Sequence, residues 1–224
     1  MNKDKIYIVI PAFNEEKVII GVINEVNAAG YENIIVVDDG SKDNTYNNAQ
    51  KAGAIVLNHL INRGKGAAAK TGIEAAKIID ADIVVTMDGD GQHDPKDISK
   101  MVKIIEQGYD VALGTRLKNS KGMPFYKIIA NQLGNFFTWM IYGLRVSDSQ
   151  SGFRAYSKKS LKVIDTRTDR YEYDSEVIRE IYRNKLKYFE IPIKVRYTEY
   201  SMNKQQKQNF INGVKTLVKM VISS

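Results

Sequence analysis

Residues 82–95 read DIVVTMDGDGQHDP, in which a short apolar run ends on oxygen-bearing side chains separated by glycines. The β-branched run over 82–88 predicts a strand buried on both faces, which is typical of a parallel sheet. The oxygen-bearing side chains belong to Asp88, Asp90 and Gln92. Gly, Asp and Pro are common turn residues, so a plain turn is one interpretation. The other is a metal site that holds a charged substrate.

Similar strands alternate with helical patterns through the first half of the chain. Apolar runs predict strands over 5–12, 33–39, 54–59, 82–88 and 109–115. The patterns between them predict helices near 15–29, 43–52, 65–79 and 95–107. Short strands that alternate with helices predict an α/β fold, here a Rossmann-like, mainly parallel sheet with helices on both faces.

The second half of the chain is less regular, and we expect it to complete the sheet and to build a pocket wall. Further strands are predicted over 152–157 and 187–197, and helices over 124–144, 174–184 and 207–222. The predicted organisation is one domain over 1–204 and a C-terminal amphipathic helix within 205–224.

The composition narrows the choice of partners and compartment. Lys and Arg number 33 against 26 Asp and Glu, a formal net charge of +7, which suits anionic partners such as acidic lipids or phosphorylated substrates. No helix-turn-helix, zinc-finger or RNA-binding signature is present, so we expect no nucleic-acid partner. The absence of cysteine excludes disulfides and fits a reducing compartment. No signal peptide or transmembrane helix is recognisable, so the sequence predicts a cytoplasmic protein.

Polar clusters follow three of the predicted strands. The first strand leads into Phe13, Asn14 and Glu15, and the second leads into Asp38 and Asp39. Ligands of open parallel sheets bind beyond the carboxyl ends of the strands, so these clusters should meet the DGDGQ segment at one edge. Helix caps and turns explain each cluster taken alone. Together, however, the carboxylates would repel one another without a cation or a ligand.

The DGDGQ segment has the chemistry of a magnesium or manganese site. Residues two apart in an extended segment point the same way, so Asp88, Asp90 and Gln92 are expected to converge. Their oxygen atoms suit Mg²⁺ or Mn²⁺, which also bind a substrate's phosphates. A calcium-binding EF-hand loop would need Gly and Glu where this chain has His93 and Ser99, so that alternative fails.

The stretch NRGKGAAAKTG, residues 62–72, is a glycine-rich and basic helix start. It lacks the pattern of a P-loop. Lys65, next to backbone amides at a helix N-terminus, would favour a phosphate or a neighbouring acid. A capped helix start without any ligand explains the stretch equally well.

Taken together, these stretches resemble the family 2 glycosyltransferases with the GT-A fold. Within that family they are most similar to the dolichyl- or polyprenyl-phosphate sugar transferases, the dolichol-phosphate mannose synthase group. The motifs that carry the resemblance are IPAFNEE, VVDDGSKDNT, NRGKGAA, MDGDGQHDP, GTR and DSQSGFRAYS, in the family's order. The resemblance implies a GT-A fold and a donor that is a UDP- or GDP-linked sugar.

The resemblance also implies roles for individual residues. Nucleotide-sugar binding is implied for Pro11, Phe13, Glu15, Val37, Asp39, Lys65, Asp88, Gly89 and Asp90. The Mg²⁺ or Mn²⁺ ion on the diphosphate is assigned to Asp88, Asp90 and Gln92. The catalytic residues would be Arg116, near the phosphates, and Asp148, near the acceptor. Acceptor or phosphate binding is implied for Lys127, Arg154, Arg196, Ser201 and Lys204.

Two positions depart from the family's pattern. Lys127 stands where an Arg is usual, and Lys keeps the charge but loses the bidentate fork. In RYTEYSMNK, residues 196–204, Glu199 stands in place of a Gly and two extra residues precede Lys204. We therefore do not carry the family's geometry around the acceptor phosphate over to this chain.

Three functions are open on this chemistry. The first is inverting, metal-dependent sugar transfer to a polyprenyl phosphate, which is already anionic and needs positioning rather than deprotonation. The second is transfer to a carbohydrate hydroxyl in polysaccharide or glycan assembly, which needs a general base. Asp148 is the candidate base. Alternatively, it orients basic residues that bind the acceptor. Asp174 and Glu176 are less favoured candidates for the base, because a charged helix start explains them. The third is a non-catalytic protein that binds a nucleotide-sugar.

Two segments bear on membrane contact. Residues 209–223 place apolar side chains on one helical face with Lys215 and Lys219 off it, as in helices that lie at a bilayer interface. The same apolar face would also suit a helix that packs on the domain or on a partner subunit. The predicted helix over residues 124–144 allows the same two interpretations. With the family resemblance added, we expect a peripheral contact with the cytoplasmic face of a membrane and a lipid-phosphate acceptor.

Overall fold

The computed structural model describes residues 5–116, 125–170, 172–196 and 200. Its strands are β1 (Ile6–Ala12), β2 (Ile34–Asp38), β3 (Ile55–Asn58), β4 (Ile83–Thr86), β5 (Val111–Thr115), β6 (Arg154–Ser157) and β7 (Tyr188–Pro192). Its helices are α1 (Ile19–Ala28), α2 (Thr45–Lys51), α3 (Lys65–Ile78), α4 (Ile98–Glu106), α5 (Phe125–Tyr142), α6 (Lys158–Val163) and α7 (Glu172–Arg183). A 3-10 turn, Pro95–Asp97, leads into α4.

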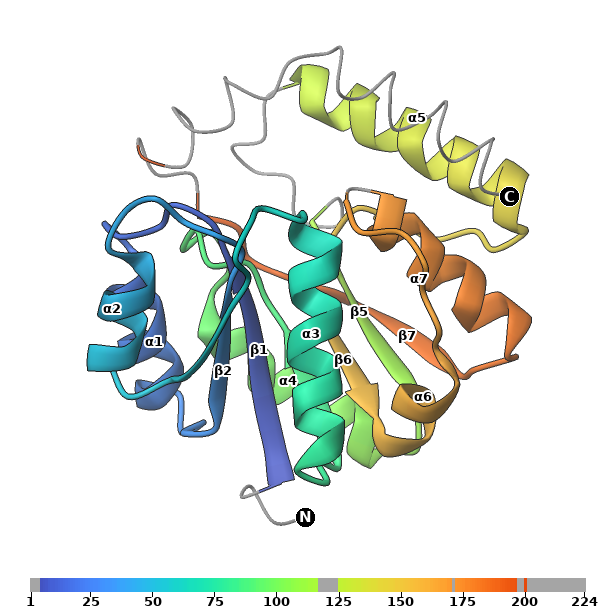
Figure 1. Ribbon diagram of the computed structural model, residues 1–224. Coiled ribbons are helices and arrows are strands. Elements are labelled where there is room, and N and C mark those ends of the chain that lie inside the picture. The colour runs from blue at the N-terminus through green and yellow to red at the C-terminus, as the bar shows by residue number, and fades with distance from the viewer. Residues whose placement is uncertain (1–4, 117–124, 171, 197–199, 201–224) are drawn as a thin grey trace.

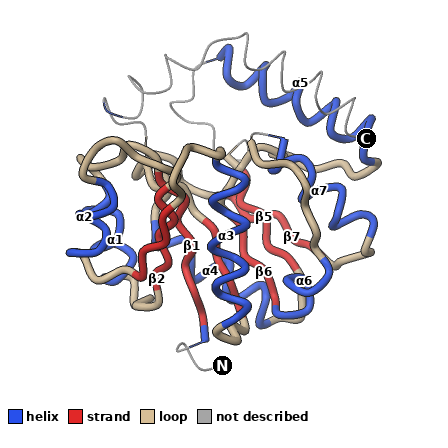
Figure 2. Tube along the Cα trace, in the orientation of Figure 1, coloured by secondary structure: helices blue, strands red, loops and turns tan. Residues whose placement is uncertain are grey.

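The strands form one sheet in the order β3-β2-β1-β4-β6-β5-β7. All neighbouring pairs are parallel except those of β6, which runs antiparallel to β4 on one side and to β5 on the other. The carboxyl ends of the parallel strands therefore meet the beginning of β6 at a single edge. Figures 1 and 2 show α5 lying across the molecule beyond this edge.

Apolar cores lie on both faces of the sheet, as its β-branched strands require. Side chains of α1, α2 and α4 pack on one face, and side chains of α3, α6 and α7 pack on the other. Figure 1 shows α3 in front of the sheet and α4 behind it. Helix α3 lies close to the strands because Gly72 has no side chain, since a Cβ there would overlap Val9. This close packing brings Lys65, the first residue of α3, to the edge of the sheet where the parallel strands end, which is called the ligand edge below.

The structure confirms the α/β fold and the mainly parallel sheet, with differences at several boundaries. Helix α1 begins at Ile19 rather than near residue 15, and β7 ends at Pro192 rather than at residue 197. Helix α6 follows β6 directly and was not predicted. The predicted helix within 205–224 lies outside the described residues. Among the described helices, none is both long enough and apolar enough to cross a bilayer.

Candidate active site

The segment after β4 is a tight turn and not an extended strand, which corrects the geometry expected for it. Strand β4 ends at Thr86, and the chain turns at Gly89 and Asp90 before Gly91, whose φ is +76°. A Cβ at Gly89 would lie 3.1 Å from the carbonyl oxygen of Pro11, so glycine allows the ends of β1 and β4 to approach closely. The turn, rather than strand periodicity, keeps the two aspartates near each other.

The electrostatics of the two aspartates fit a divalent cation. Burial alone would raise the pKa of Asp88, but the Lys65 ammonium, together with His93 and Arg116, outweighs it and holds that pKa at about 2. Burial and the neighbouring Asp88 carboxylate raise the pKa of Asp90 to about 6. Two close carboxylates are enough for Mg²⁺ or Mn²⁺ when a substrate diphosphate and waters supply the other ligands. No third acid, His or Cys joins them into a metal cluster in the described part of the chain. Gln92, the third expected ligand, is buried, and its backbone N–H donates to Asp90 Oδ1 at 3.0 Å.

Lys65 connects this turn with helix α7. Its Nζ lies 2.7 Å from Asp88 Oδ1 and 3.6 Å from Asp174 Oδ2. Burial opposes the charge on Lys65, but attraction by Asp174 and Asp88 raises its pKa above the usual value. A Cβ at Gly152 would overlap Lys65 Nζ and would lie 2.9 Å from Asp88 Oδ1. The glycine before β6 therefore leaves the space that this ion pair occupies.

Arg154, expected at the acceptor, lies in the interior. Its side chain is 1% exposed, and its NH2 group donates to the carbonyl oxygens of Ser149 and Asp174, both at 2.8 Å. The same nitrogen lies 3.5 Å from Asp174 Oδ1. An acceptor could not reach this guanidinium without a rearrangement of the core. We therefore assign Arg154 a structural role: it fixes Asp174, whose carboxylate lies next to Lys65.

The two expected catalytic residues form one ion pair. Arg116 Nε and NH2 donate to Asp148 Oδ2 and Oδ1, both at 2.7 Å, and the backbone N–H of Arg116 donates to Oδ2 at 3.0 Å. The Asp148 side chain is fully buried, whereas that of Arg116 is 23% exposed. A bidentate pair of this kind fixes the guanidinium plane. The arrangement suits Asp148 as the residue that orients Arg116 rather than as a base open to an acceptor.

Asp39, expected at the nucleotide, also holds the loop before α3. Its Oδ1 accepts the backbone N–H of Arg63 at 3.0 Å and lies 2.7 Å from His59 Nδ1. Its Oδ2 accepts the backbone N–H of Gly64 at 2.7 Å. The residue is 2% exposed. Asp39 thus fixes the loop that precedes Lys65. This structural role is separate from any contact with a nucleotide.

These contacts predict that Asp39→Ala weakens both the fold and nucleotide binding. The buried N–H of Gly64, left without an acceptor, costs about 1–3 kcal/mol, so the free energy of unfolding should fall by roughly that amount. Asp39→Asn, which keeps one acceptor oxygen, should lose less. Urea unfolding and calorimetric titration with UDP would measure the two effects. Unchanged stability and affinity in Asp39→Ala would show that neither role is real.

The other residues implied for the nucleotide differ in access. Phe13 is 36% exposed at the edge, and Pro11 is half-buried. Glu15 is buried, and its Oε2 accepts the Tyr200 hydroxyl at 2.8 Å. Val37 is fully buried, and its side chain faces α3, where a Cβ at Gly72 would come within 3.1 Å of it. We therefore assign Val37 to the core rather than to the nucleotide.

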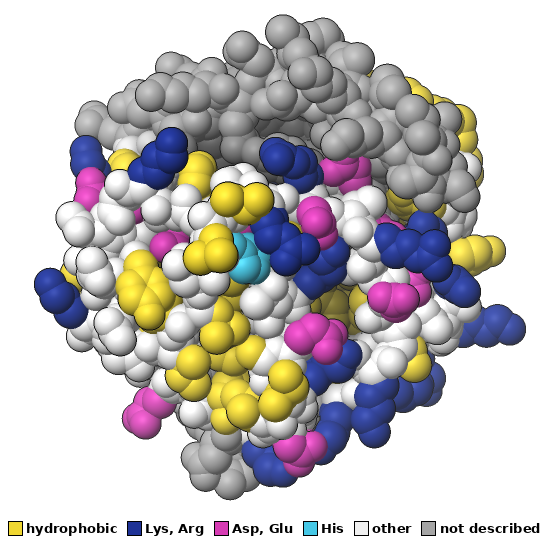
Figure 3. Space-filling model, in the orientation of Figure 1, with side chains coloured by type: hydrophobic (Ala, Val, Ile, Leu, Met, Phe, Trp, Pro, Cys, Tyr) yellow, Lys and Arg dark blue, Asp and Glu magenta, His cyan; other side chains and the backbone are white. Residues whose placement is uncertain are grey.

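Of the residues implied for the acceptor phosphate, only Arg154 and Arg196 have described side chains, and both are bonded to other groups of the protein. Arg196 donates to Glu25 Oε2 at 2.6 Å and lies 3.1 Å from Asp94 Oδ1, so it fastens the segment after β7 to α1. Lys127 is part of α5, but its side chain, like Ser201 and Lys204, lies outside the described residues. Figure 3 shows the basic side chains of one face mainly on its right side, with acidic side chains among them.

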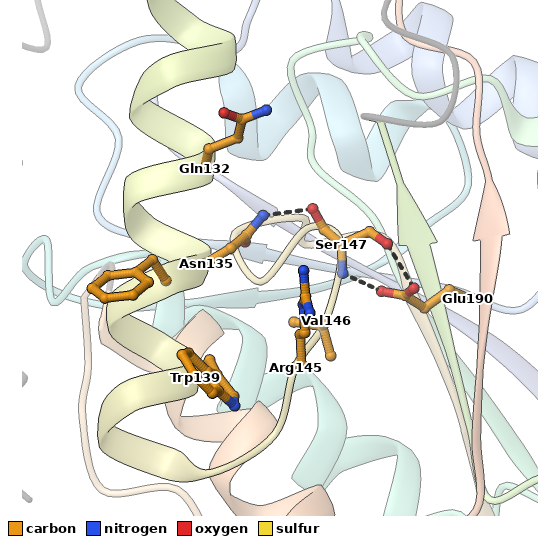
Figure 4. Close-up of a pocket in the computed structure, with 8 residues that line it drawn as sticks. Gln132, Asn135, Trp139, Arg145, Val146, Ser147 and Glu190 are labelled. Atoms are coloured by element: carbon orange, nitrogen blue, oxygen red, sulfur yellow. Dashed lines mark hydrogen bonds between the residues drawn. The ribbon is translucent and has the colours of Figure 1, made fainter.

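Sequence reasoning missed the residues that hold the loop around Asp148. A cavity of about 680 Å³ lies between α5, this loop and β7. Its lining residues are Gln132, Asn135, Phe136, Trp139, Arg145, Val146, Ser147 and Glu190. Figure 4 shows Asn135 and Glu190 both bonded to Ser147. The only signal in the sequence was the presence of Asn, Gln and Gly within an otherwise apolar helix.

The architecture is that of a GT-A glycosyltransferase, with an acidic turn, a lysine and an arginine clamp at the ligand edge. Residues 7–165 match the family described as Glycosyl transferase family 2. The chain belongs to this family and is a glycosyltransferase.

Known proteins resemble this chain over most of its length. An uncharacterised protein of Methanocaldococcus jannaschii is 47% identical and covers 99% of this chain and 93% of its own length. The UDP-N-acetylglucosamine–dolichyl-phosphate N-acetylglucosaminyltransferase of Methanococcus voltae is 43% identical over 88% of each chain. A solved glucosyl-3-phosphoglycerate synthase from Mycobacterium tuberculosis, in complex with Mn²⁺ and UDP, has a TM-score of 0.69 at 19% identity. That match covers 95% of this chain and 79% of the synthase, and it shows the shared fold.

Proposed function

We propose that this glycosyltransferase transfers a sugar from a nucleotide-sugar to a polyprenyl phosphate, with inversion at the anomeric carbon. The burial of Asp148 in its ion pair with Arg116 carries the proposal. A hydroxyl acceptor would need a general base, and the candidate base is already bound. A lipid phosphate is anionic near neutral pH and needs none. The dolichyl-phosphate acceptor and UDP-N-acetylglucosamine donor in the name of the Methanococcus voltae relative support the same choice.

The donor would lie over the turn after β4. Asp88 and Asp90 would hold Mg²⁺ or Mn²⁺, with Gln92 as a further candidate ligand. Bound there, the cation would neutralise charge that develops on the leaving diphosphate. Lys65 holds Asp88 in its ionised form, and Arg116 presents a partly exposed guanidinium on the same edge. Such fixed charges act without reorganising during the reaction.

The transfer itself would be a single displacement. An oxygen of the acceptor phosphate attacks the anomeric carbon while the bond from that carbon to the diphosphate oxygen breaks. The nucleoside diphosphate leaves with the electron pair of that bond. No proton has to be removed from the acceptor, so the chain needs to supply orientation and charge. One displacement of this kind inverts the anomeric configuration.

The outer face of α5 supports a peripheral membrane contact. Leu133, Phe136, Trp139 and Met140 are each about half exposed on this helix. Exposed aromatic and apolar side chains on one helical face are typical of helices that lie at a bilayer surface. Such a contact would bring the enzyme to a lipid-bound acceptor. The cytoplasmic location expected from the sequence stays a prediction.

The function is tested with radiolabelled UDP-N-acetylglucosamine, dolichyl or undecaprenyl phosphate, and Mn²⁺. We expect label in the organic phase, dependent on the lipid and lost on chelation with EDTA. GDP-linked sugars tested in parallel would identify the nucleotide. A water-soluble product on a sugar hydroxyl, formed without lipid, would replace this proposal with glycan assembly. Donor binding without transfer to any acceptor would favour a non-catalytic protein.

A further inference from the structure

Helix α5 has an unusual distribution of polarity. An amphipathic helix on a globular protein normally turns its apolar face inward. In α5, Asn135 and Thr138 face the protein, whereas Phe136 and Trp139 are about half exposed. The inward polar side chains are hydrogen-bonded to the loop that carries Asp148. The inner face of α5 therefore serves to hold the loop that carries Asp148.

A single side chain brackets Asp148 from both sides. Asn135 Nδ2 donates to the carbonyl oxygen of Ser147 at 2.5 Å. Asn135 Oδ1 accepts the backbone N–H of Ser149 at 2.8 Å and the Ser149 hydroxyl at 2.9 Å. The primary amide is the group that can donate on one side and accept on the other. The two residues that flank Asp148 are therefore tied to one point on α5.

The opposite side of the loop is held by β7. Glu190 accepts the backbone N–H of Ser147 at 2.5 Å and its hydroxyl at 2.8 Å. On the α5 side, Thr138 adds a weaker contact with the Ser149 hydroxyl at 3.3 Å. Figure 4 shows the loop between the Asn135 and Glu190 side chains. The position of Asp148 is thus fixed by the contacts of Ser147 and Ser149, independently of its own ion pair with Arg116.

We propose that Asn135 is a positioning residue for sugar transfer, which sets the Arg116 guanidinium through the loop and Asp148. The chain of contacts runs from Asn135 to Ser147 and Ser149, then to Asp148, then to Arg116. A displacement of about 1 Å in a group that acts on the reacting atoms can cost roughly 100-fold in rate. The inference rests on the proposed role of Arg116 in transfer but not on the identity of the acceptor.

The test compares Asn135→Ala with Gln132→Ala. Gln132 lies one turn earlier in α5 and lines the same cavity, and no hydrogen bond ties its side chain to the loop among the described residues. We expect Asn135→Ala to lower kcat by about 10- to 100-fold, with the Kd for UDP within twofold of the wild type. Its Tm should fall by a few degrees, because the buried Ser149 N–H loses its acceptor. Gln132→Ala should leave all three unchanged. In an Arg116→Ala background, Asn135→Ala should cause no further loss of kcat.

An NMR measurement separates this proposal from the proposed function. The Arg116 Nε–H, bonded to Asp148, should exchange slowly with water, and its signal is assigned by its loss in Arg116→Lys. Asn135→Ala should speed its exchange, while Gln132→Ala should not. Unchanged exchange and unchanged kcat in Asn135→Ala, or a loss that adds fully to that of Arg116→Ala, would overturn the positioning role. A wild-type enzyme that makes no lipid-linked product would overturn only the proposed acceptor, because the exchange rate needs no turnover.

Discussion

Asp90→Ala is expected to abolish cation-dependent donor binding and to reduce transfer by roughly 1,000-fold or more. A bound cation contributes several kcal/mol of charge stabilisation, and each factor of ten in rate corresponds to about 1.4 kcal/mol. Asp90 is one of only two carboxylates in the turn after β4, so its loss leaves a single charged ligand. Calorimetric titration of UDP with and without Mn²⁺, together with transfer assays, would measure the effect. Activity that survives both the substitution and a chelator would contradict the metal assignment.

The fold itself should tolerate the loss of this charge. Burial and Asp88 raise the pKa of Asp90 from its usual 3.8 to about 6, so the free energy of unfolding falls as the pH rises from about 4 to about 6 and stays lower above that range. Below about pH 3 the group is protonated in the folded and unfolded states alike, and the cost disappears. Metal-free Asp90→Asn should therefore be more stable than the wild type at pH 7.5, by on the order of 1–2 kcal/mol, and equally stable at pH 3. Urea unfolding at the two pH values would measure this difference.

Asp148→Asn is expected to lower kcat by about 100-fold while donor affinity stays close to that of the wild type. The amide keeps the shape of the side chain but loses the charge that pairs with Arg116, and removing one preorganised charge or donor typically costs about 10²–10³ in kcat. Arg116→Lys should have a similar effect, because lysine cannot make both bonds to Asp148. Steady-state kinetics combined with UDP binding would separate the two quantities.

A double-mutant cycle distinguishes orientation from base catalysis. If Asp148 serves only to orient Arg116, then Asp148→Asn should cost almost nothing more once Arg116 is alanine. A general base would still be missed in that background, because the acceptor would still have to lose its proton. A full additional loss in the double variant would restore Asp148 as a base and favour a hydroxyl acceptor.

The strands of the first half could be read from the sequence because each is a short β-branched run between helices. Strands β1 to β5 lie within two residues of the predicted boundaries at every end. The antiparallel insertion of β6 could not be read in this way. Its four residues, Arg154–Ser157, carry no signal of direction, and their neighbours in the sheet are β4 and β5, far earlier in the chain.

The candidate site was predictable where residues stand at strand ends and unpredictable where burial decides their role. The edge location of Asp88, Asp90 and Arg116 follows from the fold alone. The burial of Arg154 and the three contacts of Asp39 depend on segments that meet only in the folded chain. Asn135 was missed for a different reason. A polar residue in an apolar helix is normally placed outside, whereas α5 turns its polar side inward.

The place of β6 in the sheet sets an order for folding during synthesis. Strands β1 to β4 pair with one another, so the half of the sheet that carries the acidic turn can assemble once residue 86 has been made. Strand β5 pairs only with β6 and β7 among the described strands, so it stays unpaired until much later residues emerge. Until then the open edge of β4 is a template for pairing with other chains. We therefore expect a nascent chain halted between β5 and β6 to expose unpaired strand edges that favour aggregation and chaperone binding.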